Sequence, residues 1–341
     1  MLAFAAVTVL SALASDAPRA ALSSSRGLLL MAALWAVAGL LRDARDADRL
    51  LSALAVLAAG VALVGVLQVA ACPAEPPTWQ PAARFFHRCD RARGFFSIYM
   101  TQAGVLLLVL LATLPRLLPG RPALAWAPAA WIAGAAGLAA TYTRGAWVGL
   151  VAGALTVLPA TRRGRWMLLA GAALVALAAA AGPYELAKRL HQTVDPRAEG
   201  VAERVYMWRS GLAMWRQHPW LGVGPSGVKR HYPEFARPEA FKRRTGHVHS
   251  APLQIMVERG LLGLAAWLWI WVAFYRRVWR AWRELDPGRG RDRALLAGAA
   301  AAVAGFLVAG LAEYNFGDSE VILVLWTVMA LAVTVAREAE A

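Results

Sequence analysis

The sequence is poor in acidic residues and cysteine, and it shows no internal repeat. Its 341 residues include 21 Asp and Glu against 36 Lys and Arg, which gives a formal net charge of +15. No nucleic-acid recognition motif and no base-stacking aromatic pattern accompanies this positive charge, which argues against a nucleic-acid partner. No period of 20–50 residues and no low-complexity tract beyond an Ala and Leu bias is visible, which argues against a repeat architecture.

Long hydrophobic runs are abundant instead. Hydrophobic residues make up 59% of the chain, with 15 Trp and a mean hydropathy of +0.48. About 20 apolar residues suffice to cross a bilayer as a helix, so we expect an all-α, polytopic membrane protein with about ten transmembrane helices. The expected spans lie near residues 2–15, 27–41, 50–71, 98–115, 123–142, 145–160, 166–182, 252–275, 295–312 and 321–336. An alternative interpretation of the first run is a signal peptide, because Ala12-Leu13-Ala14 resembles a cleavage site.

Arg-rich loops predict the orientation. Loops near 42–49, 116–121, 162–165 and 276–293 are rich in Arg, and the positive-inside rule places them in the cytoplasm. One membrane domain, 1–341, would then carry one large periplasmic loop, 183–251. Between 183 and 250 there are twelve Lys and Arg against six Asp and Glu. This surplus fits a solvated surface or contact with lipid headgroups, and equally a site for an anionic substrate.

The two cysteines, Cys72 and Cys89, both fall in a predicted outer loop. An oxidising periplasm would permit a disulfide between them, closing a loop worth about 3 kcal/mol in the chain-entropy model. The spacing alone also fits two reduced thiols.

The stretch TYTRGAW, residues 141–147, places Arg144 in a tight turn between two apolar runs. A snorkelling arginine at a helix end would explain it. A cation held at the membrane boundary is also a functional candidate, because such charges are costly to keep there.

An amphipathic helix is predicted after residue 203. Its apolar positions recur at helical spacing, with Arg204 at the start and Arg209 and Arg216 on the flanks, so we expect a helix lying in the membrane interface. The apolar stripe consists of Val205, Trp208, Leu212 and Trp215.

Three glycines after this helix, Gly222, Gly224 and Gly227, spell G-x-G-x-x-G. No strand precedes them and Pro225 interrupts them, so a dinucleotide site is rejected. We expect them instead to allow close approach of the backbone to a neighbour or ligand.

Two histidines, His247 and His249, stand before the span 252–275. A metal site completed by His231 or Glu234 is one interpretation, but no third ligand has convincing spacing. Structural histidines are another. The third is a neutral imidazole, His249, that accepts a proton from a hydroxyl group, because a histidine pKa near 6.5 leaves the ring largely unprotonated at neutral pH.

A polar ladder follows these histidines into the span. Ser250, Gln254 and Glu258 recur every four residues on one helix face and need partners, for which Arg259 is available.

Three blocks of the sequence resemble the O-antigen ligase and polymerase-like membrane glycosyltransferases, over roughly residues 84–335. The first block is Thr143-Arg144-Gly145 between two helices. The second is Arg-x-x-x-Trp followed by Pro-x-x-Gly-x-Gly, here Arg204, Trp208, Pro219, Gly222 and Gly224. The third is His-x-His-Ser, then Leu-Gln and Glu-x-Gly-Leu-x-Gly, here His247, His249, Ser250, Leu253, Gln254, Glu258 and 260–263.

The resemblance implies a metal-independent, cofactor-free enzyme of the bacterial inner membrane. Such an enzyme moves a glycan from undecaprenyl pyrophosphate to an acceptor hydroxyl at the periplasmic face, here lipid A–core. It implies that Arg144 and Arg204 bind the pyrophosphate and that His249 is catalytic. We expect supporting roles for His247, Arg209 and Glu258.

Other functions stay open at this point. Within the same class, the acceptor could be a second repeat unit, as in a polysaccharide polymerase, or a protein, as in an O-oligosaccharyltransferase. In a different class, the chain would be a transporter or a non-catalytic envelope protein. Transporters usually carry charges at mid-membrane and show paired repeats, whereas here the polar residues gather at one face.

Overall fold

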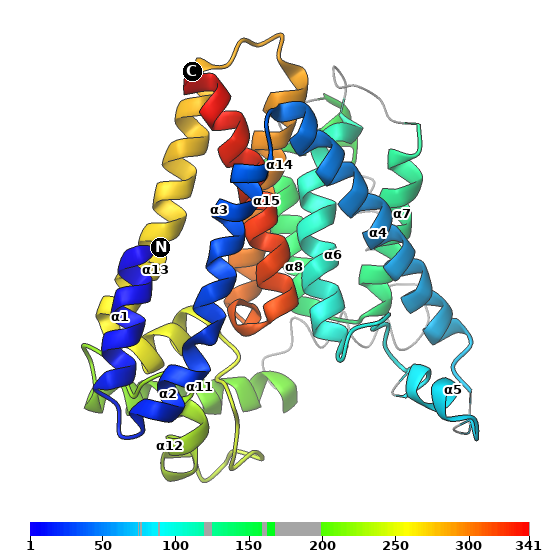
Figure 1. Cartoon of the computed structure of the whole chain (residues 1–341). Helices are drawn as coiled ribbons and strands as arrows, with labels where there is room; N and C mark the ends of the chain where they lie inside the picture. Colours follow the sequence, from blue (N-terminus) through cyan, green and yellow to red (C-terminus); the bar gives the residue numbers. More distant parts are fainter. Residues whose placement is uncertain are drawn as a thin grey trace. The chain divides into compact units, whose positions relative to one another are not determined.

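The computed structural model describes residues 1–73, 75, 77–87, 89–118, 125–158, 162–167 and 199–340 (Figure 1). Every regular element in these ranges is a helix, which confirms the predicted all-α class. Almost all of the predicted span 166–182 and the first part of the predicted large loop, 183–198, lie outside the described residues.

Among the described residues, six helical stretches are long and apolar enough to cross a membrane, so the chain is a polytopic helical membrane protein. They are Pro18–Leu40, Ala44–Ala70, Tyr99–Leu117, Ala251–Glu284, Gly290–Gly310 and Ser319–Glu340. Three further apolar helices are shorter, namely Leu2–Leu13, Ala127–Ala140 and Arg144–Leu155. The predicted count of about ten spans stays a prediction, because three of the expected spans form helices of only 12 to 14 residues and the expected span 166–182 lies almost entirely outside the described residues.

The chain divides into two compact units, each built from separate stretches of sequence. Unit 1 comprises Met1–Trp35, Val194–Arg277 and Gly310–Leu323, and unit 2 comprises Ala36–Thr193, Val278–Ala309 and Val324–Ala341. The expected single domain over 1–341, with its large loop 183–251, stays a prediction.

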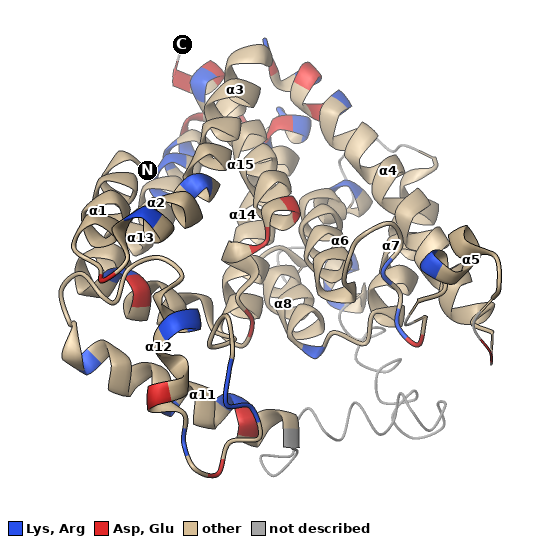
Figure 2. Cartoon of the chain, turned by 60° about the horizontal axis from the view of Figure 1, so that its bottom comes forward, with Lys and Arg blue, Asp and Glu red and all other residues tan. Residues whose placement is uncertain are grey.

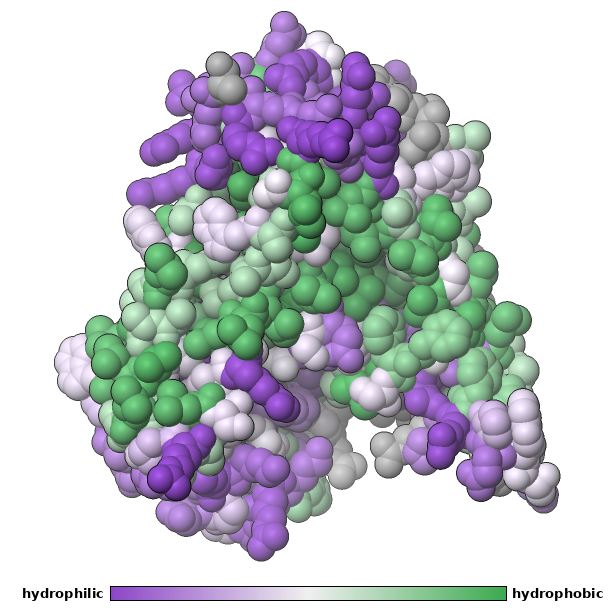
Figure 3. Space-filling view, viewed as in Figure 1, coloured by the Kyte–Doolittle hydropathy of each residue, from purple (hydrophilic) through white to green (hydrophobic). Residues whose placement is uncertain are grey.

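Unit 1 contains the N-terminal helices, the amphipathic helix and most of the long helix α13. Its elements are α1 (Leu2–Leu13), α2 (Pro18–Ser24), η1 (Ser25–Met31), α11 (Glu199–Gln217), α12 (Gly227–Phe235), α13 (Ala251–Glu284, as far as Arg277) and η4 (Asn315–Gly317). Figure 3 shows hydrophilic side chains gathered over α11 and α12 and hydrophobic ones over α1.

The predicted amphipathic helix is present as α11. Its most buried side chains are Met207, Ser210 and Met214, which pack on one face, with Val223, Val228 and Tyr232 among their neighbours. Trp208 and Trp215 of the predicted stripe lie beside this face, partly buried against the same core. The helix therefore packs on protein along a face rotated from the predicted stripe, because the two Met side chains fill the core that α12 closes.

Helix α13 is broken at Gly260, whose φ of 66° and ψ of −169° are non-helical. The backbone groups freed there are paired with the glycine-rich stretch after α11. Val223 and Gly224 donate N–H bonds to Val257 O and Glu258 O at 3.0 Å, and Leu261 donates to Pro219 O at 2.8 Å. A Cβ on Gly222 would lie 2.4 Å from the Glu258 carbonyl carbon. The expected close backbone approach is thus observed, and it satisfies polar groups that hydrocarbon could not.

Helix α1 covers the same break in α13. The Ser11 hydroxyl lies 2.6 Å from Leu221 O and 2.8 Å from Glu258 O, and Thr8 Oγ1 accepts from Arg259 Nε at 3.1 Å. Both hydroxyl side chains are buried. These two polar residues of the short apolar helix therefore form hydrogen bonds with the backbone and side chain at the α13 break.

Unit 2 is a bundle with small residues at its contacts. It contains α4 (Ala44–Ala70), α5 (Gln80–Phe85), α6 (Tyr99–Thr113), η2 (Leu114–Leu117), α7 (Ala127–Ala140), α8 (Arg144–Leu155), most of α14 (Gly290–Gly310) and most of α15 (Ser319–Glu340). Helices α8 and α14 approach so closely that a Cβ on Gly149 would lie 2.6 Å from Gly305 O. Such small-residue contacts are typical of helix packing in membranes. Lipid is as apolar as the helix surfaces, so helices associate through close packing rather than through the hydrophobic effect.

One end of unit 2 collects the charged loops that the sequence places in the cytoplasm. Arg116 pairs with Asp48 at 2.6 Å, and Arg289 pairs with Glu338 at 3.1 Å. Asp43 caps α4 by accepting N–H bonds from the first helical turn. Figure 3 shows hydrophilic side chains covering this end, where α4 begins and α15 ends.

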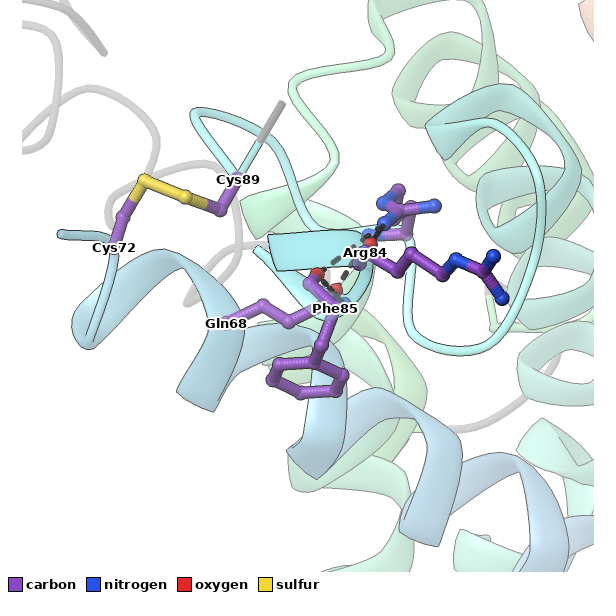
Figure 4. Close-up of a disulfide and its surroundings, with 6 residues drawn as sticks. Gln68, Cys72, Arg84, Phe85 and Cys89 are labelled. Atoms are coloured by element: carbon purple, nitrogen blue, oxygen red, sulfur yellow. Dashed lines mark hydrogen bonds between the residues drawn. A yellow bond between two sulfur atoms is a disulfide. The ribbon is translucent and has the colours of Figure 1, made fainter. Parts of the chain in front are cut away.

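Cys72 and Cys89 form a disulfide with a Cα–Cα distance of 5.5 Å (Figure 4). The loop that it closes is also held by the buried side chain of Gln68, which donates to Phe85 O at 2.9 Å and accepts from Gly94 N at 2.9 Å. Of the two states that the sequence left open, the structure shows the bridged one.

Candidate active site

The predicted base His249 is paired with a carboxylate. Its Nδ1 lies 3.1 Å from Oε2 of Glu313, which follows α14. Both side chains are mostly enclosed, with 16% and 13% of their surfaces exposed. A carboxylate only accepts hydrogen bonds, so Nδ1 of the neutral ring carries the proton and Nε2 keeps its lone pair. The pairing thus fixes the tautomer that can accept a proton at Nε2.

The same carboxylate holds Arg204. Nη2 of Arg204, in the first turns of α11, donates to Oε1 of Glu313. Glu313 therefore bridges the predicted base and one of the two predicted pyrophosphate ligands, a juxtaposition that the sequence spacing does not reveal. A guanidinium, a carboxylate and an imidazole share a partly enclosed place in unit 1, where charge interactions are stronger than in bulk water.

His247 lies against His249 with ring centroids 4.3 Å apart and against Tyr314 with centroids 5.9 Å apart. Burial, and next the neighbouring His249, lower the pKa of His247 from 6.5 to about 4. Burial also raises the pKa of Tyr314 to about 12. Both groups are consequently uncharged at neutral pH, so the charged groups that contact this cluster directly are Glu313, which lies against His249, and Arg204, which donates to Glu313.

The backbone of His249 is strained. Its φ of 50° lies in the left-handed region, which costs a non-glycine residue roughly 1–2 kcal/mol. The amide of Gln254 fixes the segment, because Val248 N–H donates to Gln254 Oε1 at 2.9 Å. Such strain persists only where surrounding contacts impose it, and it gathers at functional sites.

An aromatic cluster positions Glu313. Phe316 in η4 lies 5.8 Å from Trp267 and 6.2 Å from Trp271 of α13, and 5.8 Å from Phe4 of α1, measured between ring centroids. These edge-to-face contacts are the favourable geometry for aromatic pairs. Within unit 1, these contacts attach the segment after α14 to α13 and α1, three residues beyond Glu313.

Two residues of the predicted polar ladder, Gln254 and Glu258, make contacts at different places. Gln254 serves the histidine segment, as described above, whereas buried Glu258 pairs with Arg259 at 3.1 Å at the α13 break. The predicted supporting role of Glu258 at the site stays a prediction. The contacts of Glu258 are those of a structural ion pair beside Tyr314.

Two other residues considered in the sequence form no hydrogen bond or ion pair with His249 in the described structure. Arg209 is exposed on α11, and its supporting role stays a prediction, whereas His231 pairs with Asp16 at 3.2 Å. Within the ranges described, no three His, Cys, Asp or Glu side chains are close enough together to hold a metal ion.

Arg144 begins α8 in unit 2, directly after a turn in which Tyr142 has a φ of 51°. Thr143 N–H donates to Thr141 Oγ1 at 3.2 Å, which stabilises the tight turn that the sequence predicted. His249, Arg204 and Glu313 belong to unit 1. That Arg144 shares a site with them stays a prediction.

Sequence reasoning did not identify Glu313. A signal was present, since this Glu directly follows an apolar run in a loop expected on the same side as His249. Asp318 and Glu320 share that short loop, however, and 64 residues separate Glu313 from His249. The fold, rather than any local pattern, selects among the three carboxylates.

These features define a helical polytopic membrane protein with a carboxylate, histidine and arginine cluster beside a broken helix. The O-antigen ligase family model matches residues 128–268, which include Arg144, Arg204, His247 and His249. The match agrees with the resemblance read from the motifs: over these residues the chain is O-antigen ligase-like, and the family that it resembles is one of glycosyltransferases. No curated protein matches the chain.

Proposed function

We propose that the protein transfers a glycan from undecaprenyl pyrophosphate to an acceptor hydroxyl at the periplasmic face of the bacterial inner membrane, with lipid A–core as the acceptor. The observation that carries this proposal is the contact of Glu313 with Nδ1 of His249, because it leaves Nε2 available as a base. The O-antigen ligase match supports the reaction class.

The proposed reaction is one displacement at the anomeric carbon. Nε2 of His249 takes the proton of the acceptor hydroxyl as the acceptor oxygen forms its bond to the anomeric carbon. The bond between that carbon and the phosphate oxygen breaks, and the lipid pyrophosphate leaves with the electron pair. The imidazolium formed on His249 is stabilised by Glu313, whose carboxylate faces Nδ1 at 3.1 Å.

Arginine would stabilise the leaving group. The pyrophosphate gains negative charge as the glycosidic bond breaks, and a positioned cation contributes most where charge develops in the transition state. Arg204 is already oriented by Glu313 through Nη2, and a guanidinium has further N–H donors for phosphate oxygens. We assign the second pyrophosphate contact to Arg144, as the family resemblance implies.

The transfer reaction can be tested with purified protein in detergent. A lipid-pyrophosphate-linked glycan is offered with lipid A–core, with a second lipid-linked unit, or with a protein acceptor, each with and without a chelator. Glycan joined to lipid A–core and unaffected by chelator supports the proposal. Lengthened lipid-linked glycan would make the protein a polymerase, and absence of product with every acceptor would favour a transporter.

Substituting Arg204 tests the phosphate role within that assay. Arg204→Lys keeps the charge but loses the planar, two-pronged geometry, so we expect clearly impaired transfer if Arg204 binds phosphate. Full activity of the Lys variant would show that a general positive surface is enough.

A further inference from the structure

The loop between α12 and the histidine pair, residues 236–245, presents an aromatic ring beside cations. Phe241 is 69% exposed, and the three residues after it, Lys242, Arg243 and Arg244, are exposed as well. Figure 2 shows a stretch of loop rich in Lys and Arg beside α11. A flat apolar ring next to cations suits a saccharide that carries phosphate, because sugar C–H faces stack on the ring while phosphate oxygens accept charge-assisted hydrogen bonds.

The loop is held in one shape by hydrogen bonds to its backbone. The buried carboxylate of Glu203 on α11 accepts from Phe241 N at 2.9 Å and from Lys242 N at 3.0 Å. Arg243 donates to Arg237 O at 3.2 Å and to Pro238 O at 2.9 Å. The guanidinium of Arg243 is therefore used within the loop. A prearranged loop gains affinity because a ligand need not order it.

Lys242 and Arg244 differ from Arg243. In the described part of the chain, neither forms an ion pair with a carboxylate. Two exposed cations two residues apart, one a point charge and one a planar fork, suit a phosphate dianion, whose oxygens can accept from both.

The loop is connected to the active-site cluster through consecutive residues of α11. Glu203 holds the loop, and the next residue, Arg204, holds Glu313, which contacts His249. The charge of Lys242 also contributes to the lowered pKa of His247, after the larger effects of burial and of His249. Lys242 consequently lies near the histidine pair.

We propose that Phe241, Lys242 and Arg244 form an acceptor-binding rim, which recognises a phosphate-bearing saccharide and presents its hydroxyl to His249. This inference rests on the proposed function and adds to it the chemical class of the acceptor. The name acceptor rim is used below for these three residues.

Binding to the full chain in phosphatidylcholine nanodiscs tests the acceptor rim independently of turnover. The probe is the deacylated, phosphorylated oligosaccharide of lipid A–core, compared with the same oligosaccharide after chemical removal of its phosphates. The variant is Lys242→Gln with Arg244→Gln. The matched control is Arg216→Gln with Lys229→Gln, which removes two exposed cations from α11 and α12 outside the acceptor rim.

We expect the rim variant to bind the phosphorylated oligosaccharide about tenfold or more weakly, and the control to stay within about twofold of wild type. The dephosphorylated oligosaccharide should bind all three proteins alike. Equal losses in the rim variant and the control would overturn the proposal, because net charge alone would then explain binding. No binding by the wild-type protein would overturn it as well.

The aromatic contribution has its own variants. Phe241→Ala should weaken binding of both oligosaccharides, whereas Phe241→Tyr should retain it, since only Tyr keeps the ring. If Phe241→Ala bound both oligosaccharides as tightly as wild type, Phe241 would not belong to the acceptor rim.

Glycan transfer measured on the same proteins separates the two proposals. Rim-dependent binding without any transfer product would refute the proposed function and leave the acceptor rim standing. If the wild-type protein transferred glycan but the rim substitutions left oligosaccharide binding unchanged, the proposed function would stand and the acceptor rim would be refuted.

Discussion

The replacement Glu313→Gln would test how far the active-site geometry depends on one carboxylate. Glu313 faces Nδ1 of His249 at 3.1 Å and also accepts from Nη2 of Arg204. A Gln side chain has nearly the same shape but no charge, and one of its two terminal groups is a donor. It can therefore accept a hydrogen bond from either His249 or Arg204, while its NH₂ group opposes the other N–H donor.

The size of the effect follows from the hydrogen bond that is lost. A hydrogen bond to a charged group contributes about 1.5–3 kcal/mol, and about 1.4 kcal/mol corresponds to a factor of ten. The contact between Glu313 and His249 strengthens as the imidazole becomes charged during proton transfer, so its loss acts on the transition state. We expect kcat to fall roughly 10- to 150-fold, with a smaller change in the KM for the acceptor.

The assay is steady-state transfer from the lipid-linked glycan, with kcat and KM determined for the wild-type protein, Glu313→Gln and Glu234→Gln. Glu234 is an exposed carboxylate on α12 and serves as the matched control for the loss of one negative charge. Melting temperatures of all three proteins monitor folding. A kcat of Glu313→Gln within about twofold of wild type would refute the assignment of Glu313 as the residue that positions His249.

Three further predictions concern stability. Gly260→Ala should destabilise the protein by about 3 kcal/mol or more, because φ is 66° and the added Cβ would lie 2.1 Å from the carbonyl of Trp220. Replacing both Cys72 and Cys89 by Ser should lower stability by about 3 kcal/mol, since the disulfide closes a loop with a sequence separation of 17. The lowered pKa of His247 means that the folded state binds the proton less readily than the unfolded state, so stability should fall as the pH drops from 6.5 toward 4.

Each of these predictions has a control. Gly246→Ala should be nearly neutral, because its Cβ would meet nothing within 4 Å, and equal melting temperatures for the two Ala variants would contradict the α13 argument. Dithiothreitol should lower the melting temperature of the wild-type protein but not of the double Ser variant. His247→Gln should flatten the change in melting temperature between about pH 6.5 and 4, and a slope as steep as that of wild type would show that other groups cause it.

The helical class and several element positions were predictable from hydropathy, because a bilayer imposes both the length and the type of an apolar element. The lengths of several apolar helices were not predictable in this way. Residues 2–15, 123–142 and 145–160 have the composition of spans but form helices of 12 to 14 residues. Tight turns and small-residue contacts decide where such helices end, and these depend on neighbours distant in sequence. The break in α13 shows this clearly, since the N–H groups of the two residues that follow Gly260 donate to the carbonyl groups of Pro219 and Trp220.

The candidate site was predictable only in part, because some of its residues belong to motifs and others are brought together by the fold. His247, His249 and Arg204 are recognisable because their residue types recur in family-like motifs, and the structure brings Arg204 and His249 to one carboxylate. Glu313 has no motif of its own, and its role depends on Phe316 packing against α13. Long-range pairing of this kind leaves no periodicity in a single sequence.

The most direct test of the central claim is a single-turnover measurement with His249→Ala. Purified wild-type and variant proteins are loaded with a labelled lipid-pyrophosphate-linked glycan, mixed with the acceptor, and quenched over time, while equilibrium binding of the donor is measured separately. The account predicts that the variant binds the donor normally but forms the new glycosidic bond about 10²-fold or more slowly. A variant that forms this bond at the wild-type rate would contradict the account and assign His249 a structural role.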